Sequence, residues 1–293
     1  MRIGSDSEQF ENVGLAAYFH EPLWRVPGRI EQVSKLLVDP RWPWIPWWAR
    51  FSAIHKRDDR SSVRVGGKNG AAPLVEGMSS PKLSTLRMDR TLGAGNFSSV
   101  ALDLGRRGEE QWSEAAFELR IICRSADLPA GRSFESWLTL AHELVSAVGS
   151  LHATLGVWPS YYHAVSDTSL AQFVLDTPKG QYLLAPMTEF RDHQRLVSKW
   201  RKFLGRTYAR HPRWGTYLNA EHVAAIGGVE RIRAEVQPAR IDAVGDLTYI
   251  QLTETVETAL TAEGNERRLR LQELMAPILL GAPRPGSPAA PAG

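Results

Sequence analysis

The stretch that decides the fold runs from residue 97 to residue 124. It consists of FSSVALDL (97–104), GRRGEEQWSEAA (105–116) and FELRIICR (117–124). The two ends are rich in apolar and β-branched residues, which favour β-strands. The polar run Gly105–Gln111 between them is a turn signal. The pattern therefore predicts an antiparallel hairpin at Phe97–Leu104 and Phe117–Arg124.

The segment after this hairpin has the period of an amphipathic helix. Ser133 can cap its start and Gly156 can end it. One face of this expected helix carries the apolar residues Trp137, Ala141, Leu144, Val148, Leu151 and Leu155. The period thus predicts a helix that runs as far as Leu155.

Further elements follow from the same periodicities. Strands are expected at Val13–His20, Val157–Val165, Leu170–Leu175, Gly215–Leu218 and Leu247–Thr255. Helices are expected at Pro27–Val38, Gln194–Leu204, Glu221–Val236 with a break at Gly227-Gly228, and Glu266–Leu279 with a disturbance at Pro277. Strands and helices mix without regular βαβ alternation, so the predicted fold class is α+β, a mainly antiparallel sheet packed with several helices.

The chain of 293 residues predicts a single α+β domain over residues 1–280. Residues 56–82 are polar and rich in Gly and Ser, and they predict a long flexible loop. Residues 281–293, GAPRPGSPAAPAG, predict a disordered tail.

Composition narrows the function classes. A formal charge of +3, from 35 basic and 32 acidic residues, is too weak a field to argue for nucleic acid. The single cysteine, Cys123, excludes an intrachain disulfide and fits a reducing compartment. There is no signal-peptide start and no run of about 18 apolar residues, so we expect a cytoplasmic protein without a membrane span.

Motifs of catalysis are incomplete. Leu92–Val100 resembles the Gly-rich loop of kinases, but Ala101–Leu104 lacks the required lysine and no HRD or DFG sequence is present. His142-Glu143 begins like the zinc motif HExxH, but Ser146 stands at the second ligand position. No GxSxG elbow or Walker loop occurs. We therefore expect that the protein is not an enzyme and that it binds no metal or cofactor.

Two groups of residues are candidates for partner binding. Tryptophans 42, 44, 47 and 48 alternate with prolines, which exclude a regular helix or a central strand there. They are either fully buried or partly exposed, and an exposed subset (Trp44, Trp47 and Trp48) would be a binding hot spot. Glu254 and Glu257, followed by Glu263 and Glu266, form either a solvated acidic edge or a docking patch.

The basic segment Arg191–Arg213 contains the aromatic residues Trp200, Phe203 and Tyr208. Such interleaving suits single-stranded nucleic acid. Helical spacing nevertheless places Trp200 and Phe203 on one stripe with Leu204, which favours core contacts. Nucleic-acid binding by residues 191–213 is an alternative, as is an enzyme site dispersed over His142, His163, Asp167 and His193.

A resemblance begins at Arg213–Leu218 (RWGTYL), continuing through His222–Gly228 (HVAAIGG). This WxG-type motif, followed by a helix and a Gly-Gly break, resembles the immunity protein 52 family of bacterial polymorphic-toxin and type VI secretion systems. The resemblance implies an α+β protein that neutralises a cognate toxin, a nuclease effector, by direct contact. Trp214 before Gly215 indicates a ring over a close backbone approach, which is a structural role and not a toxin-binding one.

Overall fold

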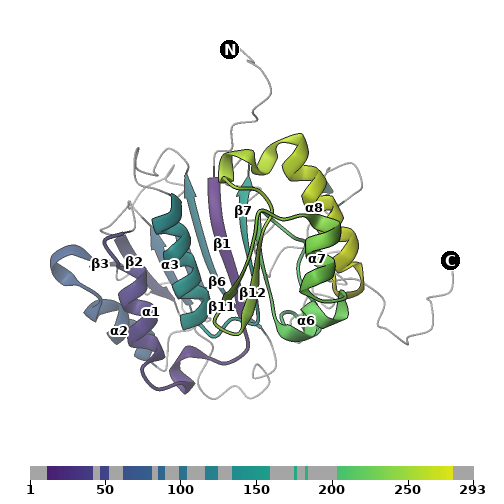
Figure 1. Cartoon of the computed structure of the whole chain (residues 1–293). Coiled ribbons are helices and arrows are strands. Elements are labelled where there is room, and N and C mark those ends of the chain that lie inside the picture. The colour runs from purple at the N-terminus through teal and green to yellow at the C-terminus, as the bar shows by residue number, and fades with distance from the viewer. Residues whose placement is uncertain are drawn as a thin grey trace, which may run out of the picture.

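The structure is a computed structural model that describes residues 12–41, 47–52, 62–80, 85–89, 99–103, 116–124, 134–158, 175–176, 182–183 and 203–279. These residues form an α+β fold built on a ten-stranded antiparallel sheet (Figure 1). The order of its strands is β11-β12-β10-β7-β1-β6-β5-β4-β2-β3. The predicted fold class is confirmed.

The strands of this sheet are β1 (Asn12–Phe19), β2 (Trp47–Ser52), β3 (Ser62–Val65), β4 (Thr85–Asp89), β5 (Ser99–Asp103), β6 (Phe117–Arg124), β7 (His152–Trp158), β10 (Gly215–Leu218), β11 (Arg240–Val244) and β12 (Leu247–Gln251). Strands β8 (Leu175–Asp176) and β9 (Tyr182–Leu183) form a separate pair. The α-helices are α1 (Arg29–Leu37), α2 (Ala72–Ser79), α3 (Phe134–Ala147), α6 (Ala220–Ala225), α7 (Val229–Val236) and α8 (Ala262–Met275). Short 3₁₀ turns are η1 (Leu23–Arg25), η2 (Gly67–Asn69), η6 (Val256–Leu260) and η7 (Ala276–Ile278).

Strand β1 lies at the centre of the sheet, between β6 and β7. All of its residues are buried, so both faces of the sheet are covered along its length. Successive side chains of a strand point to opposite faces. Leu15 and Ala17 therefore belong to one hydrophobic layer, and Ala16 and Tyr18 to another.

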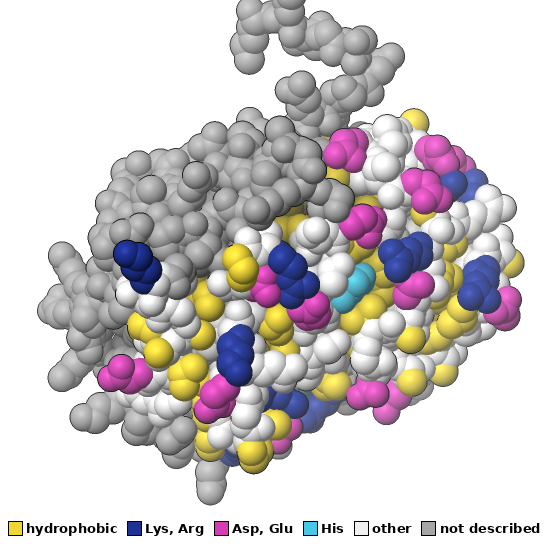
Figure 2. All heavy atoms as spheres, turned by 60° about the vertical axis from the view of Figure 1, so that its left-hand side comes forward, with side chains coloured by type: hydrophobic (Ala, Val, Ile, Leu, Met, Phe, Trp, Pro, Cys, Tyr) yellow, Lys and Arg dark blue, Asp and Glu magenta, His cyan; other side chains and the backbone are white. Residues whose placement is uncertain are grey.

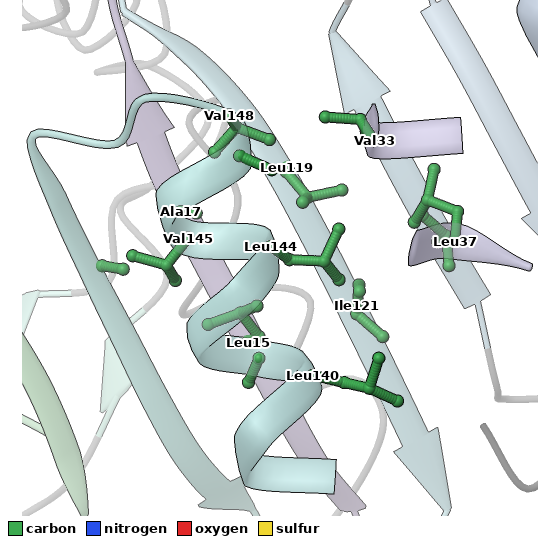
Figure 3. Close-up of a cluster of buried hydrophobic side chains, with 14 of the residues drawn as sticks. Leu15, Ala17, Val33, Leu37, Leu119, Ile121, Leu140, Leu144, Val145 and Val148 are labelled. Carbon is green, nitrogen blue, oxygen red and sulfur yellow. The ribbon is translucent and has the colours of Figure 1, made fainter. Parts of the chain in front are cut away.

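Helices α1, α2 and α3 cover the face that carries Leu15 and Ala17 (Figure 1). Figure 3 shows the centre of this layer, where α3 lies over β1 and β6 beside α1. The labelled side chains are Leu140, Leu144 and Val145 from α3, Val148 just after it, Leu15 and Ala17 from β1, Leu119 and Ile121 from β6, and Val33 and Leu37 from α1. Their interdigitation is the main core of the protein.

Helices α6, α7 and α8 pack on the opposite face, over β10 and β12. Leu218 of β10 and Ile250 of β12 are fully buried there against helix residues such as Ile232 and Leu271. Nearer the centre of the sheet, Leu204 packs on Ala16 and Tyr18 of β1. His20 also binds this segment, because its Nε2–H donates a hydrogen bond to the Leu204 carbonyl at 2.7 Å.

Several predicted elements are confirmed. Strand β1 and helix α1 occupy their predicted segments, and β5 and β6 form the predicted hairpin. The break at Gly227-Gly228 separates α6 from α7, and α8 gives way to η7 at Pro277.

The predicted end of α3 was wrong. The helix stops at Ala147, because Gly149 adopts a positive φ of 65°. The Gly149 N–H donates to the Ser146 carbonyl and the Ser150 N–H to the Val145 carbonyl, which is the Schellman arrangement of a helix end. Residues 152–158, including the expected helical residue Leu155, form strand β7 instead.

Two other expectations also need correction. Residues 56–82, expected as a loop, contain β3, η2 and α2, whose Leu74 and Met78 are buried in the main core. The prolines were expected to exclude a central strand, yet β2 begins directly after Pro46 and pairs on both sides. A proline that precedes the first paired residue removes no hydrogen bond from the ladder. The predicted cap Ser133, the predicted helix up to residue 202 and the tail 281–293 lie outside the described residues.

Replacing Leu144 with Ala tests the main core. Leu144 is 0% exposed, so we expect the free energy of unfolding to fall by about 2–5 kcal/mol in denaturant titrations. Thr139→Ala, on the exposed side of the same helix, is the matched control and should change it by no more than about 0.5 kcal/mol. Equal losses in the two variants would contradict this packing.

Candidate functional site

The Trp214–Thr216 motif fastens the start of β10. The buried Trp214 indole donates its Nε1–H to Thr253 Oγ1 at 3.0 Å, with the Thr253 carbonyl at 3.2 Å. A Cβ atom on Gly215 would lie only 2.8 Å from Cε2 of Tyr249. Glycine is therefore required by the close approach of a ring to the backbone, and these contacts are internal to the fold.

An aromatic cluster joins α3 to β10 and β12 next to this glycine. The Tyr217 and Tyr249 rings have centroids 4.7 Å apart, and the His142 ring meets Tyr249 edge-on at 4.6 Å. Nδ1 of His142 is hydrogen-bonded to the Tyr217 hydroxyl at 3.0 Å. Burial raises the pKa of both tyrosines well above the usual value, so both hydroxyls stay protonated.

His152 of β7 lies on the other face of the sheet and is 0% exposed. Its Nε2 accepts the backbone N–H of Arg210 at 3.0 Å, so the ring proton resides on Nδ1, which donates to the Tyr217 carbonyl at 2.7 Å. The ring also stacks on Tyr18, with centroids 5.8 Å apart. Both nitrogens are thus used in holding β7, β10 and the Arg210 segment together.

Three buried or half-buried histidines are held neutral. Burial lowers the pKa of His152 to about 3, with a further contribution from His222 nearby. Burial lowers the pKa of His222 to about 4 against an opposing effect of the Arg206 backbone, and among the described residues its ring nitrogens make no well-formed hydrogen bond. Burial, followed by the charge of Arg240, lowers the pKa of His142 to about 4.

An open trough of about 930 Å³ lies along α3. His142, Glu143 and Ser146 line it from α3, which contacts both α1 and β11 and so forms its middle. The other lining residues are Gly28 just before α1, Glu31, Gln32, Lys35 and Leu36 of α1, and Ala243 and Val244 of β11. The trough therefore combines apolar surface with charges of both signs.

An ion network ties α3 to the end of α1 at this trough. Arg41 binds the Glu143 carboxylate through both terminal nitrogens, at 3.0 and 2.7 Å. It also binds Asp39 through Nε and Nη2, each at 3.0 Å. The hydrogen bonds from Arg41 lower the pKa of Asp39 and keep it ionised. Figure 2, turned towards the α1–α3 side, shows acidic and basic side chains interspersed with hydrophobic ones and not gathered by sign.

The predicted partner-binding residues lie in two regions. Trp44 falls outside the described residues, and Trp47 and Trp48 are the first two residues of β2. Glu254 and Glu257 are exposed, between β12 and η6 and within η6 respectively, and the described residues contain no ion-pair partner for either.

Their acidic neighbours differ in this respect. Glu263 binds Arg267 and Glu266 binds Arg270, both along α8. The acidic edge expected from the sequence is therefore reduced to Glu254 and Glu257.

Of the dispersed enzyme site, only His142 falls within the described residues, whereas His163, Asp167 and His193 do not. Across the part of the chain that the structure describes, no three His, Cys, Asp or Glu side chains are grouped as metal ligands require. No helix there is both long and apolar enough to cross a bilayer. In the basic segment 191–213, Tyr208 is 1% exposed, so its ring is not a platform for stacking bases.

Sequence reasoning missed β11 and with it the trough. The signal was present in RIDAVGDLTYIQ (240–251), where Gly245-Asp246 is a two-residue hairpin turn between two strands. The position of β11 beside α3 could not be foreseen, because it depends on tertiary packing of the hairpin against Ser146.

The fold of this chain is similar to that of known structures. The chain is similar to Pseudomonas aeruginosa T6SS protein PA0821, with a TM-score of 0.55 and 12% sequence identity over 95% of this chain and 78% of that one. At this identity the likeness shows a shared fold and no more. No family model matches the sequence, and a search of curated proteins finds no match.

Gly215→Ala tests the close approach of Tyr249. Because the added Cβ would meet the ring at 2.8 Å and Leu155 Cβ at 3.0 Å, we expect a loss of about 1–3 kcal/mol in thermal or denaturant unfolding. Adding Tyr249→Leu to the same chain should recover part of that loss. An unchanged melting temperature for the single variant would contradict the structural role of the motif.

His222→Phe tests the neutral histidines. The pKa of His222 is about 4 when folded and near 6.5 when unfolded, so the unfolded chain binds the proton first and stability falls as pH drops from about 6.5 to 4. Between about pH 7.5 and pH 5 the variant should therefore lose about 2 kcal/mol less stability than the wild type. Denaturant titrations at both pH values measure this, and an identical pH dependence would refute it.

Proposed function

We propose that this chain is an immunity protein that binds a cognate bacterial toxin effector and neutralises it by direct protein–protein contact. The supporting observation is its likeness in fold, over 95% of its length, to a T6SS protein. The WxG motif points the same way through its resemblance to polymorphic-toxin immunity proteins. The geometry adds that this motif belongs to the core, so recognition must use other surfaces.

In this proposal the chain is a binding protein, not an enzyme, and it works without a cofactor. His142 and His152 make hydrogen bonds within the fold. His152 uses both ring nitrogens, and His142 uses Nδ1, in hydrogen bonds that join structural elements. Such groups stabilise the fold.

The effector is proposed to be a nuclease, as the family resemblance implies. A nuclease presents a basic cleft to its substrate, and an inhibitor of that cleft needs local negative charge. Glu254 and Glu257 supply two exposed carboxylates, whereas Glu263 and Glu266 are already neutralised by arginines on α8.

Co-expression with the product of the neighbouring gene tests this function. We expect a stable 1:1 or 2:2 complex on size exclusion and restored growth of cells that carry the toxin. Absence of a complex, with undiminished toxicity, would overturn the proposal. A purified complex that shows no loss of effector activity in a nuclease assay would overturn neutralisation by binding.

The double variant Glu254→Lys/Glu257→Lys tests the acidic surface. We expect binding to weaken about tenfold or more, mainly through slower association, with a smaller difference at high salt. Glu221→Lys/Glu273→Lys makes the same change of charge at exposed positions of α6 and α8 and is the matched control. Interferometry at two salt concentrations measures both, and equal affinities for the two variants would rule out this surface.

A further inference from the structure

Strand β11 forms one edge of the ten-stranded sheet. Its only strand neighbour within the described chain is β12. An edge strand presents unpaired backbone N–H and C=O groups, to which another extended chain can add.

The register of the β11–β12 hairpin identifies these groups. Val244 and Leu247 flank the two-residue turn Gly245-Asp246 and form its closing pair. Hydrogen-bonded and non-hydrogen-bonded pairs alternate along an antiparallel ladder. The pairs of Val244, Asp242 and Arg240 are therefore bonded to β12, and the backbone groups of Ile241 and Ala243 point outward.

This edge is held in place beside the trough. Gly245, at a φ of 57°, lies so close to α3 that a Cβ atom there would be 3.2 Å from Ser146 Oγ. Ala243 and Val244 line the same trough as His142 and Lys35. A segment paired to β11 would thus rest its side chains in a preformed depression of about 930 Å³.

The charges on the edge define the partner. Arg240 and Asp242 form a half-exposed ion pair, and the register places Asp242 opposite Tyr249, on the face of the sheet that α3 covers. The charges of an added strand would complement this pair if it carried an acidic residue opposite Arg240 and a basic residue opposite Asp242, with a small or apolar residue between them. The same charges disfavour unselective pairing with other edges.

We propose that β11 and the adjoining trough receive an extended segment of the effector, which adds to the sheet as a further strand. This inference rests on the proposed function, since the segment belongs to the neutralised toxin. Main-chain hydrogen bonds to Ile241 and Ala243 supply affinity, and the Arg240–Asp242 pair selects the sequence.

Amide hydrogen exchange of the complete chain, alone and in complex with the co-purified effector, tests this directly. In the free chain we expect the amides of Ile241 and Ala243 to exchange fast and that of Asp242, which the register bonds to β12, to be protected. On binding, Ile241 and Ala243 should slow by about 100-fold or more. If they do not slow in a complex that forms, strand addition is wrong while the proposed function stands.

Ala243→Pro removes one outward N–H and no bond to β12, and Ala243→Val keeps that N–H as the matched control. We expect the proline variant to bind about tenfold more weakly or worse and the valine variant to bind like the wild type. Equal binding by both would overturn the proposal, as would dimerisation of the free chain that Ala243→Pro abolishes. If the wild type binds no effector, both this inference and the proposed function fail.

Discussion

The burial of β1 on both faces is the constraint that organises this protein. A central strand of a wide antiparallel sheet adds to the hydrophobic core only where other elements pack on each of its faces. In this protein different elements pack on the two faces. Helices α1, α2 and α3 make a continuous apolar layer on one side. On the other side, among the residues that the structure describes, α6, α7 and α8 cover the β10–β12 end, and Leu204 packs on Ala16 and Tyr18. Polar side chains are buried on both faces, and on the second face they include His152 and His222.

These polar groups explain how the far end of the sheet is attached. His152 sits within β7, yet its two hydrogen bonds run to β10 and to the Arg210 segment. A buried imidazole can do this only when it is neutral, because one nitrogen must accept while the other donates. Burial enforces that state. Desolvation that would be a penalty for a charged group thus becomes a means of fixing one tautomer and one arrangement of strands.

Local sequence patterns predicted much of this fold. Features that depend on tertiary contacts were not predicted. The apolar run of β1, the apolar and β-branched segments of the β5–β6 hairpin, and the Gly227-Gly228 break are properties of short segments, and they were predicted. The end of α3 was missed because Leu151 and Leu155 continue the helical period by coincidence. Gly149 was the opposing signal in the sequence, and it ends the helix because it adopts a positive φ. Glu254 and Glu257 could be singled out as acidic, but the pairing of their neighbours Glu263 and Glu266 with arginines could be read only from the structure.

The same reasoning indicates where binding can occur. Inside the sheet every strand has two neighbours, and the WxG contacts at Gly215 leave no freedom for a side chain. A fold shared at 12% identity shows that such internal constraints can be met by very different sequences, so the fold by itself specifies no partner. Within the described chain, an edge of the sheet still offers unpaired backbone groups, and binding is proposed there. At the β11 end of the sheet the outward backbone groups of Ile241 and Ala243 lie beside the Arg240–Asp242 ion pair, and in the proposed strand addition the former supply affinity and the latter selects the sequence. The proposed role, inhibition of one toxin and not of others, needs both properties at the same place.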